Sequence, residues 1–78
     1  MYVVFMWADE RNNGWVHTDT VYNVERSDYA RMRSECAAGD GEDDDIAADL
    51  KDEAGDLIDT VLLSRQMKPR AVSMLRGK

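Results

Sequence analysis

Cysteine, histidine and proline each occur only once in this chain of 78 residues. The single cysteine, Cys36, excludes an internal disulfide framework and a metal site built from several cysteines. No apolar run approaches the roughly 18 residues of a membrane-spanning helix, and the N-terminus lacks the basic start of a signal peptide. We therefore expect a cytoplasmic chain that contacts no membrane, and we expect no cofactor.

Positive charge is also scarce, since ten lysines and arginines stand against sixteen aspartates and glutamates, for a net charge of −6. Binding to nucleic acid needs concentrated positive charge, so we expect no direct contact with nucleic acid. Apolar residues make up 44% of the chain, which is an ordinary share for a globular protein. The length permits one domain, which we place over residues 1–78.

The N-terminal third has the pattern of a β-hairpin. Residues 2–8 are rich in β-branched and aromatic side chains, and residues 15–24 alternate in polarity. Between them, Asn12-Asn13-Gly14 is a turn signal, because Asn and Gly accept the positive φ of a tight hairpin. We therefore predict an antiparallel hairpin within residues 1–24.

The first predicted strand is apolar on both of its sides. One side carries Val3, Phe5 and Trp7, and the other carries Tyr2, Val4 and Met6. Either the rest of the chain covers both sides, or a second copy covers one of them. Small chains often bury additional surface by association, so we expect a homodimer.

Two helices are predicted after the hairpin. The spacing of Tyr29, Met32 and Cys36 places them on one face of a short helix over residues 27–38. Residues 43–67 carry apolar side chains at spacings of three and four, which predicts one long amphipathic helix. The apolar positions are Ile46, Leu50, Ala54, Leu57, Ile58 and Val61. Residues 69–78 form a basic C-terminal segment.

The predicted fold class is therefore α+β, with an N-terminal antiparallel hairpin, a short helix and one long acidic amphipathic helix. The hairpin and the long helix each need a partner for their apolar faces. We expect a core in which Phe5, Trp7, Val16 and Tyr22 pack on Leu50, Leu57 and Val61.

The feature that points most directly to function is a row of aspartates on the long predicted helix. Steps of four and three residues gather on one face Asp45, Asp49, Asp52, Asp56 and Asp59. The row spans about 21 Å at 1.5 Å per residue. Duplex DNA presents one negative charge per about 1.7 Å, so such a row can occupy a groove that binds phosphates. The alternative interpretation is a solvated helix face, and both stay open.

In its size, its aspartate bias and its predicted elements, the chain resembles the small acidic proteins with which phages disarm host machinery. These include anti-CRISPR proteins and DNA mimics. The resemblance implies a non-enzymatic inhibitor in the host cytoplasm. Its partner would be a host protein with a basic nucleic-acid-binding groove, and the aspartate row is the candidate partner-binding site.

A shorter resemblance implies an enzyme. Glu53-Ala54-Gly55-Asp56 resembles the second acidic motif of the all-α nucleotide pyrophosphohydrolases (MazG-like), which hold Mg²⁺ on a triphosphate with this motif and an upstream Glu-x-x-Glu. The upstream candidate is Glu25-Arg26-Ser27-Asp28, with Asp in place of the second Glu. This alternative is Mg²⁺-dependent nucleotide hydrolysis by Glu53 and Asp56. A third interpretation is an oligomerising structural domain without a separate target.

Overall fold

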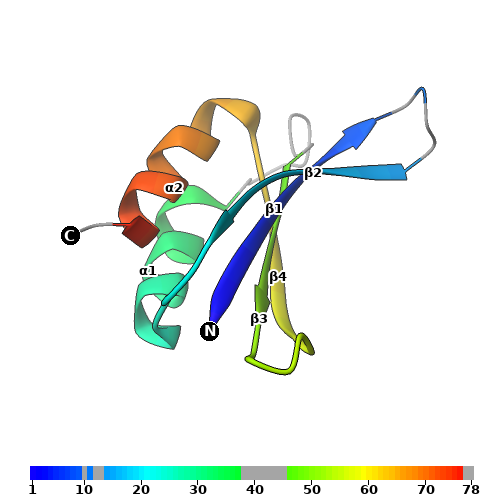
Figure 1. Cartoon of the computed structure of the whole chain (residues 1–78). Helices are drawn as coiled ribbons and strands as arrows, with labels where there is room; N and C mark the ends of the chain where they lie inside the picture. The colour runs from blue at the N-terminus through cyan, green and yellow to red at the C-terminus, as the bar shows by residue number, and fades with distance from the viewer. Residues whose placement is uncertain (10, 12–13, 38–45, 77–78) are drawn as a thin grey trace.

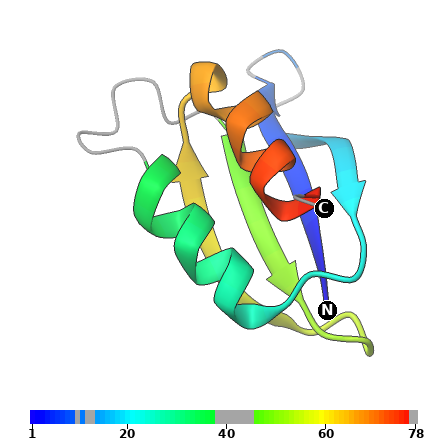
Figure 2. The same ribbon diagram turned by 90° about the vertical axis from the view of Figure 1, so that its left-hand side faces the viewer.

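The structure is a computed structural model that describes residues 1–9, 11, 14–37 and 46–76. Its elements are β1 (Tyr2–Asp9), β2 (Gly14–Val21), α1 (Arg26–Cys36), β3 (Ile46–Lys51), β4 (Leu57–Leu63), the 3-10 helix η1 (Arg65–Met67) and α2 (Lys68–Arg76). The strands form one antiparallel sheet in the order β2-β1-β3-β4. Both helices lie against the same face of the sheet, so the fold has two layers (Figure 1; Figure 2).

The class α+β is therefore right, but the predicted architecture is wrong. Most of the region predicted as one helix over residues 43–67 forms β3 and β4, with a turn between them, and η1. Residues 43–45 of that prediction lie outside the described residues. The other edge of β1 supplies a partner for β3, from the pair Tyr2↔Lys51 to the pair Trp7↔Ile46. That long-range pairing buries the apolar stretch at the start of β3 on both sides, a gain that helical periodicity does not include.

The turn between β3 and β4 shows why a helix does not continue through this region. Gly55 has a φ of +87°, a left-handed conformation that favours glycine and interrupts a right-handed helix. The carboxylate of Asp52 accepts hydrogen bonds from the backbone N–H groups of Ala54 at 2.9 Å and Asp56 at 3.0 Å. Asp side chains that bind the following backbone in this way favour turns over helices.

The β1–β2 pairing was predicted correctly, but its register was not. The pairing shifts between Phe5 and Met6, so that Val3 lies opposite Val21 and Trp7 lies opposite Val16. An extra residue in one strand moves the following side chains to the other face. Tyr22 is consequently 70% exposed. Leu57 lies opposite Lys51 after a separate shift between β3 and β4, and it is 58% exposed, so the predicted place of both residues in the core is wrong.

The core lies between the helices and one face of the sheet. Its fully buried side chains include Val3 and Phe5 of β1, Leu50 of β3, Leu63 of β4, and Met32 and Cys36 of α1. The short predicted helix is confirmed as α1, with Tyr29 also buried as the spacing requires. The basic C-terminal segment contains α2, which packs Ala71 and Leu75 into the same core. None of the described helices is long and apolar enough to cross a membrane.

Candidate interaction surfaces

The structure separates the aspartates of the predicted row. Asp49 lies opposite Thr60, whereas Asp59 lies opposite Leu50, so the two aspartates leave opposite faces of the sheet. The other positions do not restore a row, because Asp52 and Asp56 belong to the turn and Asp45 lies outside the described residues. The described aspartates therefore do not form the continuous row that was predicted.

Two of these aspartates have local structural partners. Asp49 accepts a hydrogen bond from the hydroxyl of Thr60 on the neighbouring strand. Asp52 holds the β3–β4 turn through its two backbone hydrogen bonds. The turn is closed further by the backbone N–H of Asp52, which donates to the carbonyl of Asp56 at 3.1 Å. These contacts give the aspartates a role in the fold that the sequence pattern did not suggest.

The acidic motif that resembles the pyrophosphohydrolases also loses its helical geometry. Glu53 lies in the β3–β4 turn and Asp56 directly precedes β4, so the two do not project from one helix face. Of the upstream pair, Glu25 precedes α1 and Asp28 lies in its first turn. The residues that the structure describes contain no group of three or more His, Cys, Asp and Glu that could hold a metal ion.

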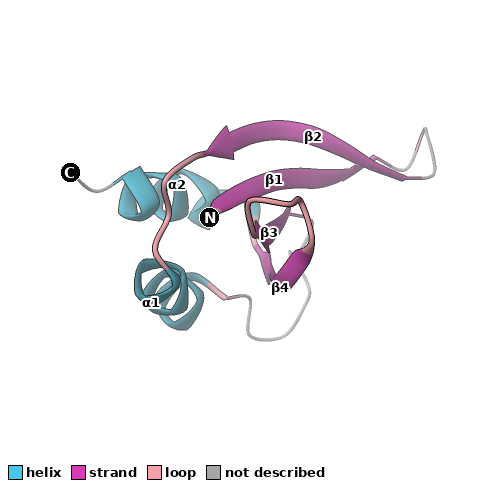
Figure 3. Ribbon diagram, turned by 60° about the horizontal axis from the view of Figure 1, so that its bottom comes forward, coloured by secondary structure: helices cyan, strands magenta, loops and turns pink. Residues whose placement is uncertain are grey.

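The sheet face opposite the helices is uncovered in the described part of the chain, as Figure 3 shows. We call this surface the open face. Strand register assigns to it Val4, Met6 and Ala8 of β1, Trp15, His17 and Thr20 of β2, Ala47, Asp49 and Lys51 of β3, and Leu57, Thr60 and Leu62 of β4. Trp15 is 49% exposed and Leu62 is 40% exposed. Large apolar side chains that remain in water on an open sheet face are candidate contacts for another protein.

Two tyrosines extend the apolar surface at the end of the open face where β1 begins and β2 ends. The rings of Tyr2 and Tyr22 meet with their centroids 5.9 Å apart. Tyr and Trp side chains combine a large apolar body with a polar group, and they are frequent anchors of protein interfaces. The open face therefore has the composition of a protein-binding surface.

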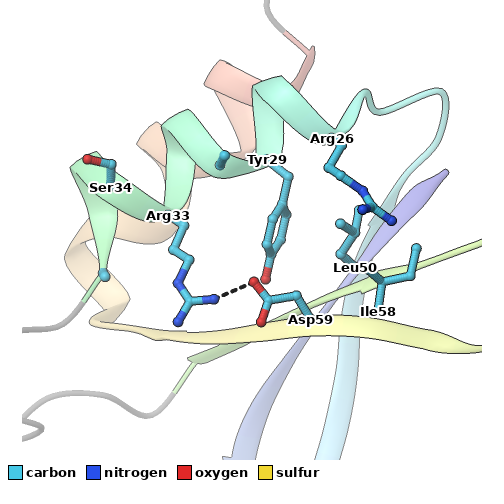
Figure 4. A pocket seen from close by; sticks show the side chains of 9 residues that line it. Arg26, Tyr29, Arg33, Ser34, Leu50, Ile58 and Asp59 are labelled. Atoms are coloured by element: carbon cyan, nitrogen blue, oxygen red, sulfur yellow. Dashed lines mark hydrogen bonds and ion pairs between the residues drawn. The ribbon is translucent and has the colours of Figure 1, made fainter.

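A second surface is a cleft between α1 and the edge strand β4 (Figure 4). Its volume is about 690 Å³. It is lined by Arg26, Tyr29, Ala30, Arg33 and Ser34 of α1, by Ala37 directly after α1, and by Leu50, Ile58 and Asp59 of the sheet. We call it the α1–β4 cleft. The small side chains of Ala30 and Ala37 leave the space open on the helix side.

Tyr29 fixes one wall of the cleft to the sheet. Its hydroxyl donates a hydrogen bond to the backbone carbonyl of Ala48 at 2.8 Å, and this contact is buried. Burial raises the pKa of the Tyr29 hydroxyl above its ordinary value of 10, because the phenolate would lose its solvation. The hydroxyl therefore stays protonated and continues to donate.

The rim of the cleft is cationic. Arg33 forms an ion pair with Asp59, and the side chains are 50% and 38% exposed, respectively. The hydrogen bond that Arg33 donates to the carboxylate of Asp59 raises the pKa of the guanidinium above its ordinary value. Arg26 lies seven residues earlier on the same helix face and also lines the cleft. The cleft thus combines an apolar floor with two arginines at its rim.

Sequence reasoning missed this cleft, because the space exists only once α1 is packed beside β4. A signal was present in the spacing of Arg26, Ala30, Arg33 and Ala37, at steps of four, three and four. That spacing places two arginines and two small residues on one face of a helix.

No family model, curated protein or solved structure matches this chain. The function is therefore argued from the open face and the α1–β4 cleft alone.

Proposed function

We propose that this protein is a non-enzymatic interaction protein that binds a partner protein through the open face of its sheet. The observation that carries the proposal is the exposure of Trp15, Leu57 and Leu62 on a sheet face that the helices leave bare. The helices and the covered sheet face already provide a core, so these side chains are not needed there. Large apolar side chains surrounded by polar groups are typical of surfaces that another protein covers.

The charge of the chain favours a partner with a basic surface. Asp49 lies within the open face, and the turn with Asp52, Glu53 and Asp56 adjoins one end of it. The net charge of −6 attracts a positively charged partner from a distance and speeds the encounter. A protein with a nucleic-acid-binding groove has such a surface, so we propose inhibition of such a host protein as the biological role. In this proposal, apolar contacts on the open face provide the affinity, and acidic residues speed the encounter by attracting the basic surface of the partner.

A second copy of the chain is the other occupant that a specific observation favours. Lys51 and Asp49 both lie on the open face, two residues apart on β3. Across a two-fold axis, an acid of one copy can face a base of the other, and the reverse contact forms at the same time. A homodimer built in this way would be the oligomerising domain of the third interpretation.

Site-specific photo-crosslinking tests the proposal. A photoreactive amino acid is placed at Trp15 or Leu57 on the open face and, as a control, at Ser73 on the outer side of α2. We expect adducts from the two open-face positions and not from Ser73. Adducts with twice the mass of the chain identify a second copy, and other masses identify a different partner.

The same experiment at several salt concentrations distinguishes electrostatic attraction of the partner from apolar contact with it. We expect the yield of adducts with a basic partner to fall as the salt concentration rises, because salt screens exposed charges. Equal yields at Trp15, Leu57 and Ser73, or no adducts from any of the three, would contradict the proposed function.

A further inference from the structure

The outer edge of β4 offers hydrogen-bonding groups to another chain. β4 is a terminal strand of the sheet, with β3 on its inner side. On its outer side, the one strand pairing seen in the described residues is an isolated antiparallel bridge between Ala37 and Leu63. The N–H and C=O groups along an unpaired edge form a template for a further strand.

The α1–β4 cleft lies beside this edge. In Figure 2, α1 runs next to β4 at the side of the sheet, and Figure 4 shows Arg26 and Arg33 reaching from α1 toward β4. Leu50 and Ile58 provide an apolar floor for alternate side chains of an extended segment. The contact of Ala37 with Leu63 shows that the edge already accepts a backbone at one end.

The two arginines define the charge of the occupant. Seven residues on a helix advance by about 10.5 Å, and an extended chain advances by about 3.4 Å per residue. Acidic side chains two or four positions apart leave the same face of an extended peptide and can therefore meet Arg26 and Arg33. The ion pair between Arg33 and Asp59 shows that a carboxylate is accepted at this rim. Both partners are partly exposed, so a peptide carboxylate can join or replace Asp59.

We propose that the α1–β4 cleft binds an extended acidic peptide segment of another protein, which adds to β4 as a further strand. The main chain of the peptide pairs with the β4 edge, which is a common mode of peptide recognition. On the face of the peptide that is turned toward α1, acidic side chains pair with Arg26 and Arg33, and an apolar side chain between them lies on Leu50 and Ile58. This site is separate from the open face and does not depend on the function proposed for that face.

A peptide titration followed by NMR tests this proposal. The probe is a blocked peptide, Asp-Thr-Val-Thr-Asp, whose aspartates and valine share one face and which is short enough to leave the Ala37–Leu63 bridge in place. We expect it to bind and to slow the exchange of alternate backbone amides within β4, because those amides become donors to the peptide. The same peptide with lysine in place of aspartate should not bind. A version with N-methylated backbone amides should lose most of its affinity.

Paired variants test the arginines. In Arg26→Gln/Arg33→Gln, the affinity for the aspartate peptide should fall about tenfold, since two partly exposed ion pairs of somewhat under 1 kcal/mol are lost. The matched control, Arg31→Gln/Arg76→Gln, removes the same charge from positions that do not line the cleft. Its affinity should stay within about twofold of the wild-type value. Circular dichroism verifies that both variants fold.

Any of four outcomes would overturn the proposal. The first is equal binding of the lysine peptide. The second is binding of the aspartate peptide without slower amide exchange in β4. The third is equal loss of affinity in the two double variants. If the wild-type protein does not bind the aspartate peptide at all, the proposal is also wrong, whereas crosslinking from the open face is unaffected. The proposal for the cleft and the function proposed for the open face can therefore be disproved independently.

Discussion

The two faces of the same sheet differ in what covers them. Leu63 and Leu62 are neighbours in β4, yet Leu63 is fully buried under the helices and Leu62 is 40% exposed on the open face. The side chains of adjacent strand residues leave opposite faces, so identical residue types meet different surroundings. The covered face stabilises the fold, and the apolar side chains of the open face need another explanation. We expect substitutions on the two faces to separate stability from binding.

The largest predicted effect compares these two leucines. Leu63→Ala should lower the free energy of unfolding by about 2–5 kcal/mol, because it leaves a cavity in the core. Leu62→Ala should lower it by less than about 1 kcal/mol, since the side chain is partly in water already. Urea denaturation of both variants at one low protein concentration measures the difference. Equal losses would mean that the open face is buried in the stable state of the protein.

The next prediction concerns Tyr29, which faces the covered side. Tyr29→Phe removes the hydroxyl that donates to the buried carbonyl of Ala48 and should lower the free energy of unfolding by about 1 kcal/mol. The exposed Tyr22 provides the control, because Tyr22→Phe removes a hydroxyl at a residue that is 70% exposed. Thermal unfolding near neutral pH should distinguish the two variants clearly.

The pH dependence of stability follows from the same residue. Burial raises the pKa of Tyr29 in the folded protein above the value of 10 that it has in an unfolded chain. Its contribution is complete below the unfolded pKa and is lost as the pH rises through the folded pKa, because the unfolded state then releases a proton first. Wild-type stability should therefore fall above about pH 10 more steeply than that of Tyr29→Phe. Parallel curves would contradict this account.

A further prediction tests the open face by association. Trp15→Thr/Leu62→Thr introduces β-branched residues, which suit strands, and removes two exposed apolar side chains. Binding to a second copy or another partner should weaken about tenfold or more, since interface anchors usually contribute over 1 kcal/mol each. Sedimentation velocity over a range of concentrations measures self-association. Unchanged association would place the interface elsewhere.

The accuracy of sequence-based prediction also differs along the chain. The alternation in residues 15–24 and the helical spacing of Tyr29, Met32 and Cys36 each fit one kind of element, and α1 and the β1–β2 pairing were predicted correctly. From Ile46 to Val61, the apolar spacing fits a helix as well as two short strands. Only the pairing of β3 with β1 decides between them, and that contact joins distant positions, from Trp7 with Ile46 to Tyr2 with Lys51.

The apolar sequence of β1 already indicated a larger sheet, although the prediction of a two-stranded hairpin did not use it. Val4 and Met6 were interpreted as a surface for a second copy, whereas β1 is also a central strand with a neighbour on each edge. Central strands are usually more apolar than edge strands, so β1 itself indicated that a further strand was needed. The α1–β4 cleft could not be predicted, because it depends on the position of α1 relative to β4.

The smallest predicted effect distinguishes the observed β3–β4 turn from the predicted helix with its row of aspartates. Asp52→Ala removes the acceptor for two backbone N–H groups and should lower the free energy of unfolding by about 1 kcal/mol. Asp56→Ala keeps its own backbone N–H in that turn and should change stability by no more than about 0.5 kcal/mol. On a helical row, removal of either charge would relieve repulsion and stabilise the protein slightly. Thermal unfolding of the two variants distinguishes the cases, because a gain in stability for Asp52→Ala is incompatible with a turn that its carboxylate holds.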